Sequence, residues 1–225
     1  MRHSIAVRFE AEYLLHIPPS VDAQTLLVLT LHGYGSNPET MLRLTEMAVG
    51  GDAIIAGLRG PNQHYLAPLG GPVAGREVGY NWGTVGHAAI NIKLHHEMVR
   101  TVSEELRGRF EIPIRRTVLM GFSQPVGMNY RYVGTYPEVA AGVIAICGGV
   151  PKDWEEDKYG PVECPILHIA RAEDEFFPEA VARGFPDRLR AHARSVEFHM
   201  LPGAHRFPSK AGPLIRQFLD RLRTP

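Results

Sequence analysis

One serine lies where its hydroxyl could act as a nucleophile. The segment Gly121-Phe122-Ser123-Gln124-Pro125 comes directly after the apolar run TVLM and before a stretch with helical character. A serine on a sharp strand-to-helix turn projects its Oγ clear of the sheet and close to a helix N-terminus. Free serine is a weak nucleophile, so this interpretation requires a neighbouring base that a carboxylate orients. The alternative is that Ser123 only caps the helix.

Two later segments could supply the base and the carboxylate. The run GAH follows the last apolar stretch and ends at His205, which alone among eleven histidines combines a strand end, a preceding glycine and a late chain position. Glu173, Asp174 and Glu175 follow the run PILHIA. One of these carboxylates is expected to face the base, and the others to belong to a solvated acidic loop. The order serine, carboxylate, histidine is that of the α/β-hydrolase arrangement.

The run LHGYG at residues 31–35 ends another apolar stretch. Its two glycines allow a sharp backbone turn that brings an N–H towards a reacting oxygen. We therefore expect the amides of Tyr34 and Gln124 to form an oxyanion hole with two donors. Taken alone, the run would be no more than a glycine-rich loop leading into a helix. Together the segments predict attack by Ser123 on an acyl carbonyl, with His205 as the base, and they require no cofactor.

The elements that must position these residues follow from hydrophobic periodicity. Short apolar runs alternate with longer amphipathic ones, which predicts a mostly parallel sheet with helices on both faces and an antiparallel N-terminal edge. In such sheets ligands gather at the carboxyl ends of the strands. Residues 59–86 are rich in glycine and proline without a period, and are expected to form a long loop. Strands are predicted at 4–9, 13–17, 25–31, 53–58, 117–120, 140–147, 165–170 and 196–201, and helices at 87–109, 123–135, 179–194 and 211–222. A further helix is expected to open at Asn37-Pro38, with Asn37 as its N-cap and Pro38 at the first helical position.

Composition excludes several classes of protein. The 225 residues carry 24 Lys+Arg and 24 Asp+Glu, so the sequence lacks the basic footprint of a nucleic-acid-binding protein. Two cysteines cannot form a disulfide framework, and no HExxH or CxxC pattern indicates a metal site. No stretch is long and apolar enough to span a membrane. We expect a single cytoplasmic domain over residues 1–225, with the oligomeric state open, a homodimer included.

The sequence resembles the phospholipase/carboxylesterase family of small α/β-hydrolases, which includes acyl-protein thioesterases and bacterial carboxylesterases. The similar stretches are LHGYGSN, RGPNQHYLAPLGG leading to GYNWG, GFSQ, ARAEDEFFP and GAHRF. The resemblance implies an α/β-hydrolase fold and hydrolysis of small-molecule esters or thioesters. It also implies that Ser123 is the nucleophile, His205 the base and Asp174 the acid, because the family places its acid four residues before a proline.

The same resemblance implies further roles. Tyr34 and Gln124 match the positions of the oxyanion hole, and Trp82 matches an aromatic residue beside the acyl site.

Phe176 and Phe177 are candidate substrate-binding residues because they lie between the proposed acid and the proline that follows it. Tyr65, Leu66 and Leu69 are further candidates for the acyl pocket, with ordinary core packing as the alternative for each. The short segment 151–161 is too small for a large lid, which favours small to medium acyl groups. Its acidic run is expected to be a solvated face in preference to a recognition patch.

One position departs from the family pattern. The usual G-x-S-x-G ends in glycine, whereas Pro125 stands there in this sequence. Proline is tolerated in a first helical turn, but it pushes the preceding residue away from the right-handed helical region. That residue is Gln124, so we expect a slower hydrolase or a reshaped oxyanion hole. The departure keeps two alternatives open: a non-catalytic binding protein with this fold, and a related reaction such as acyl transfer or dienelactone-type hydrolysis.

Overall fold

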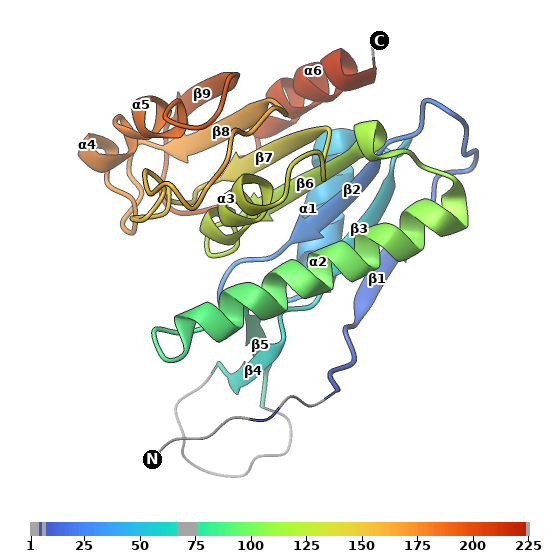
Figure 1. The fold of residues 1–225 in the computed structure, drawn as a ribbon, viewed down its shortest axis with the longest axis horizontal. Helices are drawn as coiled ribbons and strands as arrows, with labels where there is room; N and C mark the ends of the chain where they lie inside the picture. Colours follow the sequence, from blue (N-terminus) through green and yellow to red (C-terminus); the bar gives the residue numbers. More distant parts are fainter. Residues whose placement is uncertain (1–4, 6–7, 67–75, 224–225) are drawn as a thin grey trace.

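A seven-stranded sheet forms the centre of the molecule (Figure 1). The computed structural model describes residues 5, 8–66 and 76–223. The strand order is β1-β3-β2-β6-β7-β8-β9, and β1 alone runs antiparallel to its neighbour. The strands are β1 (Tyr13–His16), β2 (Leu27–Leu31), β3 (Ile54–Leu58), β6 (Thr117–Phe122), β7 (Gly142–Ile146), β8 (Ile166–Arg171) and β9 (Val196–Leu201). The predicted mostly parallel sheet with an antiparallel N-terminal edge is therefore confirmed.

The central strands are apolar along their whole length because both faces of the sheet are covered. All residues of β2, β3 and β7 are buried. A strand that meets helices on both sides has no solvent face, so its sequence shows a continuous apolar run in place of alternation. The two faces carry two separate hydrophobic clusters, one packed against α2 and α3 and the other against α1 and α6.

The helices lie in two layers on either side of the sheet. In Figure 1 the long α2 crosses the near face, and α1 lies behind the strands. Contacts between α1 and α6, and between α2 and α3, agree with this division. The helices are α1 (Pro38–Val49), α2 (Ala88–Phe110), α3 (Val126–Thr135), α4 (Glu179–Ala182), α5 (Phe185–Leu189) and α6 (Ala211–Arg223), with a short 3₁₀ turn, η1, at Ile114–Arg116.

Local sequence signals set the start of α1, the helix that follows the glycine-rich LHGYG segment. The Asn37 side chain accepts a hydrogen bond from the Thr40 amide at 2.8 Å, and Pro38 occupies the first helical position. An asparagine cap satisfies one of the free N–H groups at a helix start, and proline there lacks only an N–H that has no helical partner. The predicted cap of this helix is thus confirmed.

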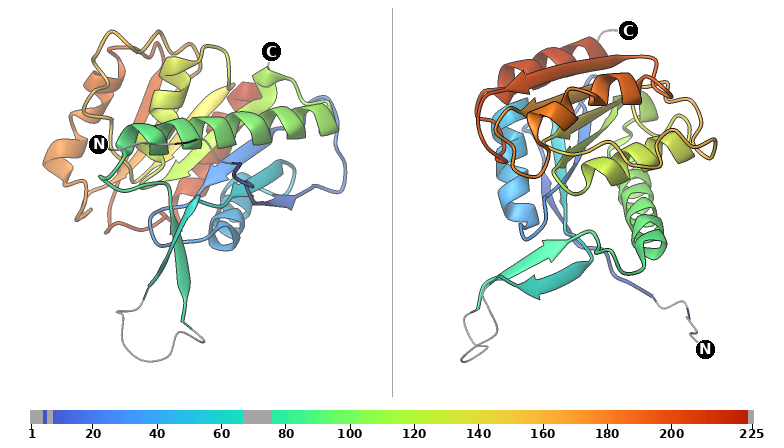
Figure 2. Two further views of the ribbon diagram at one scale, coloured as in Figure 1. Left: turned by 60° about the horizontal axis from the view of Figure 1, so that its bottom comes forward. Right: turned by 90° about the vertical axis from the view of Figure 1, so that its left-hand side faces the viewer.

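Several predicted elements differ in the structure. Residues 59–86 were expected to lack secondary structure, yet they contain a two-stranded antiparallel hairpin of β4 (Asn62–Tyr65) and β5 (Val78–Asn81). Figure 2 shows this hairpin projecting from the body of the molecule. The predicted helix over 179–194 is two short helices. The predicted strand over 4–9 is absent at its described residues Ile5, Arg8 and Phe9, and its other residues lie outside the described part.

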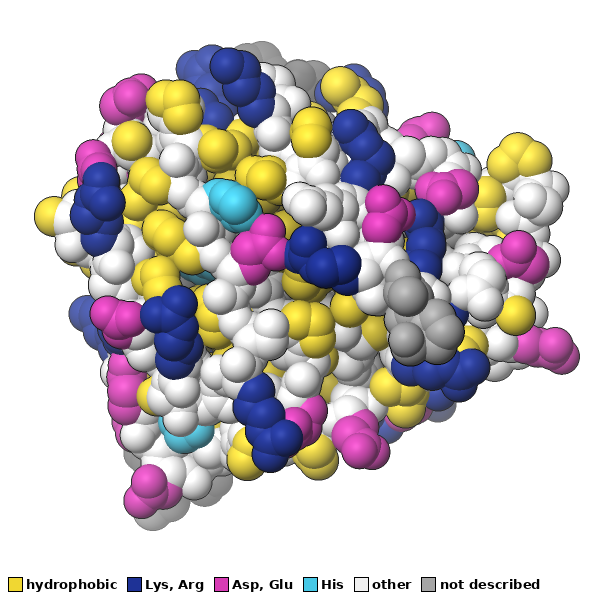
Figure 3. All heavy atoms as spheres, turned by 90° about the horizontal axis from the view of Figure 1, so that it is seen from above, with side chains coloured by type: hydrophobic (Ala, Val, Ile, Leu, Met, Phe, Trp, Pro, Cys, Tyr) yellow, Lys and Arg dark blue, Asp and Glu magenta, His cyan; other side chains and the backbone are white. Residues whose placement is uncertain are grey.

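No helix within the described residues is long and apolar enough to cross a membrane. The charges on the visible face are mixed. Figure 3 shows Lys and Arg side chains lying among Asp and Glu side chains, with apolar atoms between them. This mixture accords with equal numbers of acidic and basic residues in the chain.

Candidate active site

The turn between β6 and α3 places Ser123 in a strained backbone conformation. Its φ of 63° lies in the left-handed region, which non-glycine residues seldom adopt. The Ser123 amide still donates to the Ile146 carbonyl at 2.8 Å, so the β6–β7 pairing extends to the turn itself. The turn lifts the hydroxyl above the carboxyl ends of the parallel strands. Strain of this kind persists only where the surroundings hold it, as at the nucleophile elbow of α/β-hydrolases.

Ser123, His205 and Asp174 form a continuous relay of hydrogen bonds. The distance from Ser123 Oγ to His205 Nε2 is 2.8 Å, and His205 Nδ1 lies 2.7 Å from Asp174 Oδ2. The Asp174 carboxylate can only accept a hydrogen bond, so the imidazole must carry its hydrogen on Nδ1. This tautomer leaves Nε2 as the acceptor for the Ser123 hydroxyl proton. The three residues come from three loops that follow β6, β8 and β9. The sheet therefore brings together side chains that are up to 82 positions apart.

The Asp174 carboxylate is fixed from two sides. Its Oδ1 accepts hydrogen bonds from the amides of Phe176 and Phe177, each at 2.9 Å, while Oδ2 serves the histidine. The Asp174 side chain is only 1% exposed, so water does not compete for these contacts. Of the three carboxylates in this segment, Asp174 is the one that contacts the imidazole. The adjacent Glu175 lies outside and accepts the His205 backbone amide at 3.1 Å.

The two candidate phenylalanines have different surroundings. The Phe176 ring is 67% exposed and its centre lies 4.7 Å from the centre of the His205 imidazole. Phe177 is half-buried and packs against the core, with its ring in the space that a Cβ on Gly149 would occupy. Phe176 thus presents an apolar surface beside the base, and Phe177 mainly supports the loop.

Trp82 lies just after β5 and is completely buried. Its indole N–H donates to the His32 carbonyl at 2.8 Å. Contact between Trp82 and an acyl group stays a prediction. Of the three other pocket candidates, Tyr65 and Leu66 are partly exposed at the end of β4, and Leu69 lies outside the described residues.

The LHGYG segment lies against the nucleophile. A Cβ built on Gly33 would come within 3.3 Å of the Ser123 Cβ and 2.9 Å of the Phe122 ring, so only glycine allows this approach. His32 holds the segment through both ring nitrogens: Nδ1 lies 2.8 Å from the Gly33 carbonyl, and Nε2 accepts the Gly60 amide at 2.9 Å. Burial lowers the pKa of His32 and keeps the ring neutral, as one donor and one acceptor require.

Pro125 fits the start of α3 without disturbing it. The residue is the N-cap, with φ −72° and ψ −12°, and its carbonyl accepts from the amides of Met128 and Asn129. Helix α3 begins at Val126, so the predicted start at Ser123 is three residues too early.

The amides of Tyr34 and Gln124 donate to no other residue in the described part of the chain. The Gln124 side chain bonds to the loop after β5, which sequence reasoning did not foresee.

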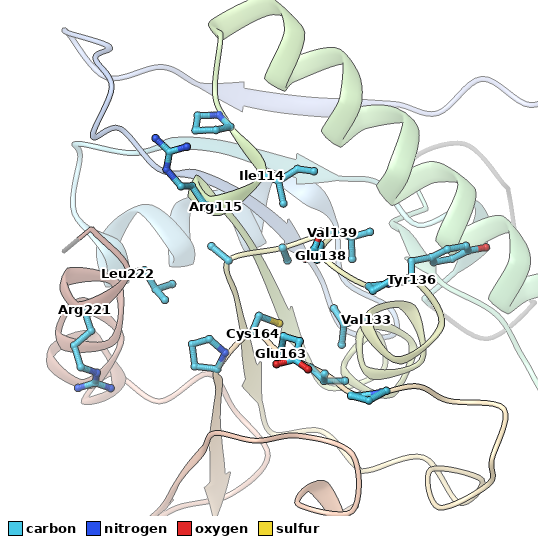
Figure 4. Close-up of a pocket in the computed structure, with 17 residues that line it drawn as sticks. Ile114, Arg115, Val133, Tyr136, Glu138, Val139, Glu163, Cys164, Arg221 and Leu222 are labelled. Carbon is cyan, nitrogen blue, oxygen red and sulfur yellow. The ribbon is translucent and has the colours of Figure 1, made fainter. Parts of the chain in front are cut away.

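Two cavities differ in their relation to the relay. One of about 520 Å³ opens beside Tyr34 and Gln124 and is otherwise mainly apolar, with Val85, Ile92 and Met128 in its wall. A larger one of about 600 Å³ lies at the amino ends of the parallel strands, between η1 and α6 (Figure 4). Because the relay lies at the carboxyl ends of the same strands, the larger cavity is at the opposite end of the sheet and cannot serve it.

The neighbouring cysteine is not a competing nucleophile. Cys147, at the end of β7, is buried, and burial together with the negative charge of Asp174 raises the pKa of its thiol to about 12. A thiol rather than a thiolate is therefore present at neutral pH. Among the residues that the structure describes, no group of three or more His, Cys, Asp or Glu side chains is placed to hold a metal ion.

The fold and the serine elbow define the class of α/β-hydrolases. A sequence profile of the phospholipase/carboxylesterase family matches residues 14–222, and the chain belongs to that family. Membership indicates a hydrolase of the esterase or thioesterase kind. The comparison with curated proteins finds no match.

Solved structures show the same fold at low sequence identity. A carboxylesterase from Bacillus cereus superposes with a TM-score of 0.74 at 15% identity, over 94% of each chain. Esterase PE8 gives 0.73 at 20% identity, over 95% of this chain and all of the other. SOBER1 from Arabidopsis thaliana gives 0.71 at 17% identity, over 88% of this chain and 99% of the other. At these identities the likeness establishes the fold alone.

Proposed function

We propose that the chain hydrolyses carboxylic esters, thioesters included, through a covalent acyl-enzyme on Ser123. The relay from Ser123 Oγ through His205 to the buried Asp174 carboxylate carries this proposal. A hydroxyl 2.8 Å from a correctly oriented imidazole has the contact that general-base activation needs.

In the first half-reaction, Ser123 Oγ bonds to the acyl carbon while its proton passes to His205 Nε2. The carbonyl π electrons move onto oxygen to give the tetrahedral oxyanion. When the oxyanion collapses, the bond to the leaving alcohol or thiol breaks, and His205 donates its proton to that group. In the second half-reaction, water attacks the acyl carbon while His205 takes one of the water protons. When the second tetrahedral oxyanion collapses, the bond between the acyl carbon and Ser123 Oγ breaks, His205 returns the proton to Oγ, and the carboxylic acid is released. Asp174 stabilises the imidazolium in both halves.

The amides of Tyr34 and Gln124 would bind the oxyanion. The approach of Gly33 to Ser123 supports the first donor, since it brings the LHGYG segment to the nucleophile. The second donor lies at the N-terminal end of α3, where N–H groups have no helical partner and the helix dipole favours negative charge. Each such donor contributes on the order of 10² to 10³ in rate.

We propose small to medium acyl groups as substrates. The cavity of about 520 Å³ that Tyr34 and Gln124 help to line is within the usual range for small-molecule sites. Its apolar walls suit an alkyl chain, and the exposed Phe176 ring next to His205 offers a second apolar contact. A cytoplasmic location is proposed on the two free cysteines, which suit a reducing compartment.

The proposal is tested with a fluorophosphonate probe, which reacts covalently with activated serines. We expect one label per wild-type chain, no label on Ser123→Ala, and hydrolysis of 4-nitrophenyl esters and one thioester by the wild type alone. Cys147→Ala is the matched control and should label like the wild type. A wild-type chain that takes no label and hydrolyses none of the esters would refute the proposal and favour a non-catalytic protein.

A further inference from the structure

We propose that Trp82 and the Gln124 side chain form a clamp that sets the position of the two oxyanion amides relative to each other. The inference rests on the proposed function, because it assigns a positioning role for that reaction. Trp82 is fully buried and Gln124 lies at the wall of the cavity of about 520 Å³, but neither side chain acts on the substrate in this proposal. The clamp acts through the backbone amides of Tyr34 and Gln124.

The first half of the clamp is the Gln124 side chain. Its Oε1 accepts the backbone N–H of Trp82 at 2.9 Å, and its Nε2 donates to the Gly83 carbonyl at 2.7 Å. The two bonds run in opposite directions to consecutive residues, so the amide group can bind in one orientation only. Both are partly buried, which shields them from competing water. The residue after the nucleophile is thereby fastened to the loop that follows β5.

The second half is the Trp82 indole. Its Nε1–H donates to the carbonyl of His32 at 2.8 Å, and the ring is fully buried. His32 in turn holds the Gly33 carbonyl through Nδ1. Trp82 therefore contacts both loops: through its side chain the segment that carries the Tyr34 amide, and through its backbone the residue that carries the Gln124 amide.

The clamp also explains how Pro125 is accommodated. A residue before proline is pushed away from the right-handed helical region, which would change the direction of the Gln124 amide. Because both atoms of its terminal amide are held, the Gln124 side chain restrains its own Cα and so limits the rotation of the backbone there. An oxyanion hole depends on donors that are already in position before the charge develops. A looser Gln124 would bind substrate equally well and stabilise the oxyanion less.

The test uses the full chain with 4-nitrophenyl pentanoate as substrate and butylboronic acid as the analogue of the tetrahedral intermediate. Gln124→Met keeps the backbone amide and the length of the side chain but removes both bonds. We expect kcat to fall about 10- to 100-fold, the inhibition constant of the boronic acid to rise by a similar factor, and KM to change less than threefold. Fluorophosphonate labelling should persist at a reduced rate, which shows that the variant is folded.

A matched control separates positioning from general stability. Thr45→Val removes a buried hydrogen bond of 2.7 Å to Thr30 on the opposite face of the sheet, and should lower the melting temperature without changing kcat or boronate affinity. Trp82→Phe removes the indole N–H. Because Gln124→Met and Trp82→Phe each open the same clamp, their effects should not multiply. The kcat of the double variant should fall no more than about threefold below that of the worse single variant.

Two outcomes overturn the inference while leaving the proposed function in place. In the first, Gln124→Met lowers only the melting temperature and keeps kcat and the boronate affinity of the wild type. In the second, the losses of Gln124→Met and Trp82→Phe multiply in the double variant, which would mean two independent supports. Failure of the wild type itself to label or hydrolyse would instead refute the proposed function.

Discussion

At the scale of single residues, the site depends on the hydrogen bonds that both oxygens of the Asp174 carboxylate accept. One oxygen accepts the His205 ring N–H, and the other accepts two backbone amides. These contacts leave no freedom for the carboxylate to rotate. An amide in place of the acid would keep its oxygen towards the two backbone donors, and its NH₂ group would face His205.

Asp174→Asn is therefore expected to reverse the tautomer of His205. The ring would then carry hydrogen on Nε2 and offer Ser123 no acceptor. We predict that kcat falls on the order of 10³- to 10⁴-fold with KM nearly unchanged, as measured by steady-state hydrolysis of 4-nitrophenyl esters. Glu175→Gln is the control, since its amide oxygen still accepts the His205 backbone N–H, and it should change kcat less than tenfold. Equal losses in the two variants would contradict this assignment.

Residue types and strand ends were enough to predict Ser123 and His205, but Asp174 was singled out only by the family resemblance, and the contacts that hold the relay were not predicted. Three adjacent carboxylates follow β8, and periodicity could not say which one turns inward. Nor could the sequence show that the Gln124 side chain reaches the loop after β5, because those residues are 42 positions apart. Such a contact depends on where the fold brings two distant loops. The GYNWG stretch, which the family resemblance singled out, contains the partners of that side chain.

At the scale of elements, the elbow depends on close packing between the start of α3 and the end of β7. A Cβ on Gly148 would lie 2.3 Å from the Val126 Cβ and 2.7 Å from the Ser123 carbonyl oxygen. A Cβ on Gly121 would meet the Asn129 side chain at 2.9 Å. Glycines at these two positions permit the close approach on both sides of the turn.

Gly148→Ala should therefore disturb the elbow directly. The new methyl group must push the backbone at Ser123 or the side chain at Val126, which we expect to cost about 1–3 kcal/mol in the free energy of unfolding and to lower kcat more than tenfold. Urea denaturation and steady-state kinetics measure the two effects. Gly127→Ala in α3 is the matched control, because its nearest neighbour would be a carbonyl oxygen at 3.4 Å. A Gly148→Ala chain with wild-type stability and kcat would show that the packing is not tight.

Apolar runs predicted the strands of the main sheet well, because a strand covered on both faces is apolar throughout. The hairpin was missed for the same reason: β4 reads NQHY and β5 reads VGYN, so neither has an apolar run. The acidic run in residues 151–161 is a solvated face at Glu155, Glu156 and Asp157, as expected, but the segment as a whole packs against the body of the molecule. There Trp154 is completely buried, and Asp153 pairs with Arg131 of α3. A polar sequence can still fold onto the body when one aromatic residue anchors it.

At the scale of the whole molecule, histidines buried in the core make stability depend on pH. His95 on α2 and His168 on β8 are completely buried, and burial lowers the pKa of each from 6.5 to about 3. The His168 ring accepts or donates one hydrogen bond with the Tyr130 hydroxyl at 2.7 Å and otherwise meets the rings of Phe185 and Phe198. Nothing in these surroundings would stabilise a charged imidazole.

Below pH 6.5 the unfolded chain takes up protons on these rings, whereas the folded chain does not until about pH 3. The free energy of unfolding must therefore decrease as the pH falls through this window. At pH 5, each histidine accounts for a loss of about 2 kcal/mol in the free energy of unfolding relative to pH 7.5.

His168→Gln does not titrate and keeps an acceptor for Tyr130. Between pH 7.5 and 5, urea denaturation should therefore show about 2 kcal/mol less loss for this variant than for the wild type, whatever its stability at pH 7.5. The comparison is between the two proteins' changes in the free energy of unfolding from pH 7.5 to pH 5, so the contributions of surface groups that titrate in both proteins cancel. An equal loss in the two proteins would mean that His168 is protonated within the folded core.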